Sequence, residues 1–198
     1  VSAWAHASSG VPPGWAATSN RPGVNRLDNL DADAVQHISN SINTVKQAGD
    51  IAVVSIHWGG NWGYDISAWQ LEFAHRLIDT ASVDVVHGHS SHHVKGIEVY
   101  RGKLIIYGSG DLLNDYEGIG GHEEYRADLS LMYFPSVEPS TGKLVQLKMM
   151  PTQIRHLRIN SADKNDALWL KDMLNREGRE LGTRVRLNPD NSLVLEWK

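Results

Sequence analysis

The sequence predicts an α/β fold in which a parallel strand–helix–strand unit precedes a series of antiparallel strands. Two apolar, largely β-branched runs, 51–56 and 83–87, have the composition of strands that are buried on both faces. Between them, Ser67-Ala68-Trp69-Gln70 has the pattern of a capping box that opens a helix. A strand, a helix and a second strand in this order predict a right-handed parallel crossover.

The elements on either side of this unit follow from turn residues and from the spacing of apolar residues. Residues 1–28 are rich in Gly, Pro, Ser and Asn and are expected to be irregular. Apolar residues recur at helical spacing over 31–46, and a later helix is expected over 162–177, ending at Gly178. Further strands are expected over 94–100, 103–107, 127–137, 143–150, 153–159, 183–187 and 192–197, with a long loop over 108–126 and a single domain spanning 1–198.

The composition narrows the classes of partner. A net charge of -4 and a pI near 6.2 give no electrostatic reason to expect a nucleic acid or an anionic membrane. No apolar stretch approaches the ~18 residues that a membrane span needs, and the first residues lack a signal-peptide pattern. Because the chain has no cysteine, any metal ion must be held by His, Asp, Glu, Asn or water.

Histidines gather at the ends of the two apolar runs. Four of the ten histidines lie within 87–93, and His57 ends the other run, so one shared site is expected. Three imidazoles, from His57, His89 and His92, suit a divalent transition metal such as zinc, iron, manganese or nickel. The alternative is that these histidines cap strand ends and bond to the backbone. Their number and their flanking glycines favour the metal site.

Asp111 and His93 are the predicted catalytic residues. Asp111 follows the strand 103–107 and is the carboxylate best placed to bind the metal or to orient a histidine. Capping a turn is the alternative role for Asp111. His93 or His87 is the candidate for moving protons. Strand alternation turns His87 away from its neighbours, so we expect it behind the ligands or in the core.

Other residues near these motifs have two interpretations each. Asn61 and Asp65 are either oxygen ligands or turn-forming residues. Trp58 and Trp62 either form an aromatic wall for a sugar or peptide or pack the surroundings of the site, and packing is favoured. Four residues of the long loop are interpreted as loop polar groups: Asn114, Asp115, Tyr116 and Glu117.

Three segments resemble the capsule-synthesis CapA family: Ile56-His57-Trp58-Gly59, residues 84–92 and residues 97–111. Members of that family are linked to poly-γ-glutamate biosynthesis, and the family is similar to calcineurin-like metallophosphoesterases. The resemblance covers roughly residues 10–160. It implies a two-layer β-sandwich flanked by helices, an αββα architecture, and it matches His57, His89 and His92 to metal-ligand histidines of the family.

The chain departs from the family pattern in several places. The family usually has Glu at Asn61, His-Pro at Ser90-Ser91 and Asn at Asp111. The family's amino-terminal half, with an early Gly-Asp motif and an Asn-Asn-His motif, has no counterpart in this sequence. The resemblance therefore implies the later half of the fold and does not extend to a complete dinuclear centre.

The predicted function is metal-dependent hydrolysis of the metallophosphoesterase type, associated with capsule or poly-γ-glutamate metabolism. Its substrate would be a small molecule or a polymer such as poly-γ-glutamate or a polysaccharide. The alternative is a non-catalytic assembly or binding protein for an anionic cell-surface polymer. The resemblance implies a bacterial cell envelope. Because 51–56 and 83–87 would lack partner elements, we also expect exposed apolar surface or a homo-oligomer.

Overall fold

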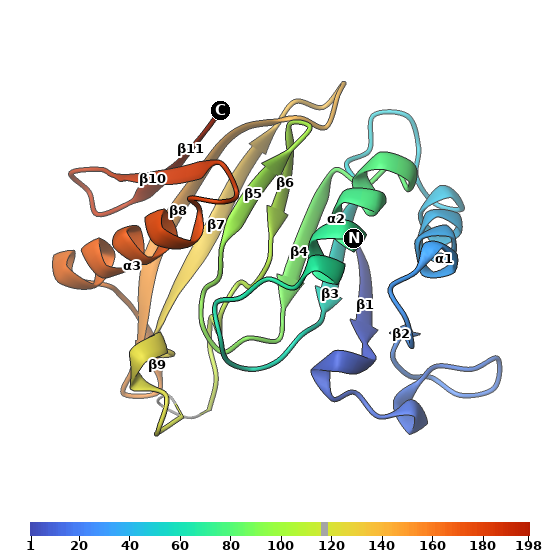
Figure 1. The fold of residues 1–198 in the computed structure, drawn as a ribbon, viewed down its shortest axis with the longest axis horizontal. Coiled ribbons are helices and arrows are strands. Elements are labelled where there is room, and N and C mark those ends of the chain that lie inside the picture. The colour runs from blue at the N-terminus through green and yellow to red at the C-terminus, as the bar shows by residue number, and fades with distance from the viewer. Residues whose placement is uncertain (116–118) are drawn as a thin grey trace.

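The computed structural model describes residues 1–115 and 119–198, which form two β-sheets flanked by helices (Figure 1). Helices α1 (Ala32–Asn43) and α2 (Ala68–Thr80) cover one face of the first sheet, and α3 (Lys164–Glu177) packs on the face of the second sheet that also meets the first sheet. Two sheets with three helices packed against them confirm the predicted α/β fold class.

The first sheet has six strands in the order β2-β1-β3-β4-β6-β5. Neighbouring strands are parallel except for β5 and β6, which form the predicted hairpin. The unit β3-α2-β4 is the predicted parallel crossover. The strand bounds are β1 (Ser2–His6), β2 (Arg26–Leu27), β3 (Val53–His57), β4 (Val85–His89), β5 (Ile97–Tyr100) and β6 (Lys103–Ile106).

The second sheet is antiparallel, with the order β10-β11-β8-β7 and with β9 paired to β8. Strand β7 lies at one edge of this sheet, and its far end carries half-exposed to exposed side chains. The strand bounds are β7 (Leu129–Val137), β8 (Leu144–Arg155), β9 (Arg158–Ser161), β10 (Thr183–Leu187) and β11 (Leu193–Trp197).

Two apolar cores hold the layers together. In the first, Val54 and Ile56 of β3 pack with Phe73 of α2, and α1 completes the cover. The second core joins the two sheets and α3, and it includes Val85 of β4 and Leu147 of β8. Strands β3 and β4 therefore separate two environments, because alternate side chains of a strand point to opposite faces.

The helices begin where the sequence predicts. In α2, the side chain of Gln70 accepts a hydrogen bond from the backbone N–H of Ser67, as expected for a capping box. The carboxylate of Asp163 accepts hydrogen bonds from the backbone of Asn165 and Asp166 at the start of α3. These contacts satisfy N–H groups that have no partner within the helix.

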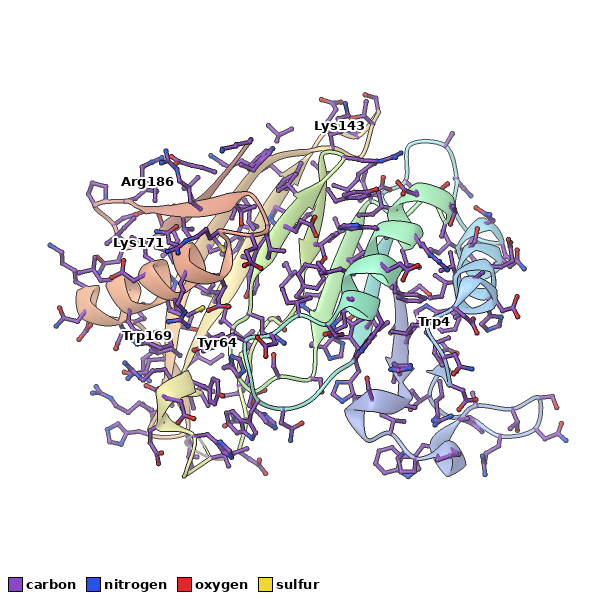
Figure 2. The ribbon with its side chains drawn as sticks, in the orientation of Figure 1. Trp4, Tyr64, Lys143, Trp169, Lys171 and Arg186 are labelled. Atoms are coloured by element: carbon purple, nitrogen blue, oxygen red, sulfur yellow. The ribbon has the colours of Figure 1, made fainter. Side chains whose placement is uncertain are left out.

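The prediction that residues 1–28 are irregular is wrong for β1 and β2. Strand β1 pairs in parallel with β3, and the Cα atoms of Trp4 and Ile56 are partners in that ladder. The indole of Trp4 packs edge-on against His37 of α1, with ring centroids 5.1 Å apart (Figure 2). The segment has little intrinsic strand pattern, and it forms a strand because β3 offers it hydrogen-bonding groups and a buried position for Trp4.

The predicted separation of strands 143–150 and 153–159 is also wrong. Strand β8 runs without a break through Pro151 to Arg155, and the chain then turns at His156 and Leu157, both with φ of 54°. On the side of β8 that faces away from β7, the partner strand changes along the chain. Strand β11 pairs with β8 at Lys148 and Met149, and β9 pairs with β8 from residue 152 onward. Pro151 lies between these two partner strands, where its lack of an N–H is tolerated.

The prediction that 51–56 and 83–87 are buried on both faces is wrong for β3 and for His87 of β4, and it is confirmed for Val83, Val85 and Val86. Val54 and Ile56 are fully buried, whereas Val53 and Ser55 are half-buried. The two strands also have partners on both sides, so the expectation that they lack partner elements is wrong. The apolar surface lies in a groove of about 580 Å³ between the sheets, which β3 and β4 help to line. The groove is lined by Val53, Val85, Leu104, Ile106, Leu131 and Phe134, among others.

Within residues 1–115 and 119–198, none of the helices has the length and hydropathy that crossing a bilayer requires. This finding agrees with the absence of a long apolar stretch in the sequence.

Candidate functional site

The candidate site begins with two histidines at the carboxyl ends of β3 and β4. The Cα atoms of His57 and His89 are direct partners in the parallel ladder. Their side chains point to the same face, and the two Nδ1 atoms are 3.1 Å apart. The structure thus brings together two of the three predicted metal ligands, at the sheet edge where the sequence placed them.

Ser55 and His87 continue this arrangement along the same face. The Oγ atom of Ser55 is 3.1 Å from Nε2 of His89 and 3.1 Å from Nδ1 of His87. Residues two apart on a strand share a face, which places Ser55 below His57 and His87 below His89. The four side chains form one hydrogen-bonded chain in the order His57, His89, Ser55 and His87. His87 therefore lies behind the predicted ligands, as strand alternation suggests.

His92 and Asp111 meet at the same end of the sheet. Nδ1 of His92 donates a hydrogen bond to Oδ2 of Asp111 over 2.8 Å, and Nδ2 of Asn114 donates to the same oxygen over 3.0 Å. The turn before His92 is held by a hydrogen bond from its backbone N–H to the carbonyl oxygen of Asn61. Asp111 thus contacts a predicted ligand, and Asn114 contacts Asp111.

Burial keeps the histidines of the sheet face neutral. Burial, together with the neighbouring His57 and His87, lowers the pKa of His89 to about 4. The pKa values of His57 and His87 are also lowered, mainly by burial, and nearby His92 contributes to the shift of His57. A neutral imidazole is the form that binds a metal ion, so the environment favours the ligating state at neutral pH.

His93 lies apart from this face, in an aromatic cluster. Its side chain is fully buried, its Nδ1 donates to the carbonyl oxygen of Val94, and its ring stacks on Tyr125 at 4.7 Å between centroids. Burial lowers the pKa of His93 to about 4. Tyr64 of the same cluster packs edge-on against His93 and lies under Arg176 of α3 (Figure 2). The structure therefore does not bring His93 to the face that carries His57 and His89, and its catalytic role stays a prediction.

The flanking tryptophans differ in burial. Trp58 is fully buried and its Nε1 donates to the carbonyl oxygen of Tyr107, which is the packing interpretation. A Cβ atom at Gly88 would lie 2.5 Å from that Nε1, so the indole requires a glycine there. Trp62 is half-buried, stacks on His122 at 4.1 Å and lies 5.4 Å from His92 between ring centroids. Trp62 thus borders the site.

The remaining polar candidates contribute mainly backbone atoms. The carbonyl oxygen of Asp65 accepts a hydrogen bond from Nζ of Lys95 over 2.6 Å, and Asn61 uses its carbonyl oxygen as described above. Both contacts favour the turn-forming interpretation. Of the loop polar groups, Tyr116 and Glu117 lie outside the described residues.

The side chains partly fit a metal ion. Among residues 1–115 and 119–198, no set of three or more His, Cys, Asp or Glu side chains has metal-binding geometry. The 3.1 Å separation of Nδ1 in His57 and His89 is nevertheless close to the roughly 3.3 Å between two nitrogens of a tetrahedral zinc site. The other nitrogen of His89 contacts Ser55, which is the kind of outer contact that orients ligating histidines. The pair fits two positions of a coordination sphere, and His92 is the third candidate.

An open cavity of about 540 Å³ gives access to these groups. Its lining joins the histidine face to the turn that carries His92 and to Asp111. Four residues line both this cavity and the apolar groove: His87, Ser109, Gly110 and Leu112. The site therefore has a polar end and an apolar end.

Sequence reasoning missed Ser55, and it interpreted Asn114 only as a loop polar group. Ser55 is a polar residue in an apolar run, two positions before His57, so it shares the face of the histidine. That spacing is a usable signal. Asn114 follows Asp111 by three residues within a loop, where spacing carries no such information.

Comparison with known proteins supports the resemblance. The family model for the bacterial capsule synthesis protein PGA_cap matches residues 1–116. A protein of Mycobacterium tuberculosis strain H37Rv, named probable polyglutamine synthesis accessory protein, is 47% identical over 189 residues, which cover 95% of this chain and 50% of the relative. The PGA biosynthesis protein CapA of Bacillus subtilis is 37% identical over 102 residues, covering 52% of this chain and 25% of the relative.

The extent of these matches defines what the chain shares with its relatives. The chain spans about half the length of the mycobacterial relative that it matches. The family model covers β1 to β6 and therefore includes His57, His89, His92 and Asp111. The chain belongs to the bacterial capsule synthesis protein PGA_cap family.

Proposed function

We propose that this chain carries part of a metal-dependent hydrolytic site of the metallophosphoesterase type, acting in capsule or poly-γ-glutamate metabolism. The observation that supports the proposal best is the pair of Nδ1 atoms of His57 and His89, 3.1 Å apart at adjacent strand ends. Two imidazole nitrogens this close favour either a shared proton or a shared cation. Both rings are kept neutral by burial, which suits the cation.

The proposed ligands are His57, His89 and His92, and the ion would be zinc, manganese or iron. His92 would bind through Nε2, because Asp111 accepts the hydrogen bond from Nδ1. This contact fixes the ring orientation and raises the basicity of the imidazole. When bound, such an ion lowers the pKa of a coordinated water and polarises a phosphoryl or acyl oxygen. The chain itself supplies the ligands and the orientation of His92.

The proposed substrate is a small molecule or an extended anionic polymer such as poly-γ-glutamate. The cavity at the histidine face is open, and the exposed Leu112 and Leu113 line it. The names of the relatives, which mention polyglutamine synthesis and PGA biosynthesis, supply the polymer class. Proton transfer by His93 or His87 belongs to the same proposal.

A second candidate function is non-catalytic binding or assembly of an anionic cell-surface polymer. It is favoured by the word "accessory" in the name of the mycobacterial relative and by the incomplete donor set among the described residues. In that case, the histidine face and Trp62 would contact the polymer without hydrolysing it.

Metal analysis of the purified chain, followed by hydrolysis assays, separates the two candidates. The chain is dialysed against zinc, manganese or iron, bound metal is counted, and turnover of bis(p-nitrophenyl) phosphate and of poly-γ-glutamate is measured. We expect one bound ion per chain and measurable turnover. His89→Ala should lower both the bound metal and the turnover, whereas His75→Ala should change neither, because His75 bonds to Glu98 away from the histidine face. Polymer binding with neither metal nor turnover would support the second candidate.

A further inference from the structure

Ser55 is the link between the histidine pair and the interior of the site. Its Oγ atom lies 3.1 Å from Nε2 of His89 and 3.1 Å from Nδ1 of His87. A serine hydroxyl has one proton, so it can donate to only one of these nitrogens and must accept from the other. The protonation of three groups is therefore coupled through one hydroxyl.

The coupling allows two directions for the hydrogen-bonded chain. In the first, Nε2–H of His89 donates to Ser55, and the hydroxyl donates to Nδ1 of His87. Neutral His89 then has no proton on Nδ1, the atom that faces His57 at 3.1 Å. In the second direction, Ser55 donates to Nε2 of His89, and the proton of His89 is on Nδ1. Only the first direction leaves the atom facing His57 with a lone pair.

We propose that Ser55 is a positioning residue of the histidine site. By accepting from Nε2–H of His89 and donating to Nδ1 of His87, it holds the imidazole of His89 in the tautomer whose Nδ1 can bind a cation shared with His57. His87 acts through Ser55 and completes the arrangement. This inference rests on the proposed metal-dependent function and assigns a role to two residues behind its ligands.

The surrounding backbone indicates that the fold does not need the hydroxyl. The backbone of Ser55 is an interior rung of the sheet, with Ala3 of β1 and His87 of β4 as its ladder partners. Alanine keeps the same Cβ atom and the same ladder. Replacement of Ser55 by alanine should therefore change the site while leaving the sheet intact.

The test is zinc affinity, measured by competition with a chelating dye in the whole chain. Ser55→Ala is expected to weaken zinc binding by 10- to 100-fold, the range that is typical for an outer partner of a metal ligand. Ser55→Thr keeps the hydroxyl and should therefore bind zinc with an affinity close to that of the native chain. Ser39→Ala, a matched serine in α1 on the covered side, should bind like the native chain.

A second readout reports the tautomer directly and needs no metal. Two-bond ¹⁵N–¹H correlation spectra of the metal-free chain should show His89 as a single Nε2–H tautomer in the native chain and as a mixture in Ser55→Ala. A native chain that binds no zinc would overturn the proposed function, and the spectra would still decide the role of Ser55. Native zinc binding with equal affinity and the same tautomer in Ser55→Ala would overturn this inference alone.

Discussion

Strands β3 and β4 present two faces of opposite character. Toward α1 and α2 they present Val54, Ile56 and Val86, each fully buried in an aliphatic core. Toward the second sheet they present half-buried Ser55, His57, His87 and His89. One backbone ladder therefore carries stability on one face and candidate chemistry on the other. Most residues of the two runs are apolar, so their composition suggested burial on both faces. Only Ser55 and the histidines mark the open face.

The largest expected effect is loss of stability on the covered face. Ile56→Ala removes a fully buried side chain and should lower the free energy of unfolding by about 2–5 kcal/mol, because it leaves a cavity in a close-packed core. His57→Ala, the adjacent residue on the open face, should change it by less than about 1 kcal/mol. Urea denaturation of both variants measures the contrast. Equal losses would show that the two faces do not differ in this way.

The next effect concerns metal affinity and should be confined to the open face. His57→Ala and His89→Ala should each weaken zinc binding by at least tenfold, about 1.4 kcal/mol, because each removes one nitrogen of a close pair. The double variant should lose less than the sum of the single losses, because the two nitrogens act on one ion. Isothermal titration calorimetry gives the four affinities. Additive losses would indicate two independent sites.

Acidification should destabilise the chain through its buried neutral histidines. Burial holds the pKa values of His89 and His93 at about 4, below the usual 6.5. Their contribution to stability is complete above pH 6.5 and is lost as the pH falls toward 4, because the unfolded chain binds these protons first. The slope should reach roughly 1.4 kcal/mol per pH unit for each histidine. Chemical denaturation at several pH values measures it, and His93→Phe should reduce the slope.

The smallest effect on stability is expected at the apolar groove between the sheets. Phe134 of β7 is 51% exposed and lines this groove, so Phe134→Ser should change the free energy of unfolding by no more than about 0.5 kcal/mol. It should nevertheless reduce the binding of a hydrophobic dye and any self-association, because exposed apolar surface on an edge strand favours both. Dye fluorescence and sedimentation provide the readouts. Unchanged dye binding would show that the dye binds to an apolar surface other than this groove.

The sequence predicted those elements whose local pattern agrees with their environment. The capping box at Ser67 and the terminal hairpin are local signals, and both are present. Strand β1 was missed because Ser2–His6 is a strand only through its pairing with β3. The continuity of β8 was missed because Pro151 normally indicates a strand end, whereas here its neighbours are two separate strands. Both errors arise from long-range pairing.

The candidate site likewise contains features that the sequence predicts and features that depend on contacts between distant segments. His57 and His89 were predicted because parallel strand ends meet at one edge, and that argument depends only on topology. The contact between His92 and Asp111 joins a turn and a loop. Asp111 was a candidate because it follows the strand 103–107, but that position did not indicate which histidine it would contact. The separate environment of His93 follows from aromatic packing with Tyr125, which sequence adjacency to His92 does not reveal.

The ladder pairing of His57 with His89 has a consequence for how much the chain can vary in length. The crossover between the two strands can gain or lose residues in its loops, because the site depends only on which rungs face each other. A single insertion within β3 or β4 would instead turn the histidine into the aliphatic core and bring an aliphatic side chain to the cavity. Length variation among relatives should therefore be frequent around α2 and absent from these two five-residue strands.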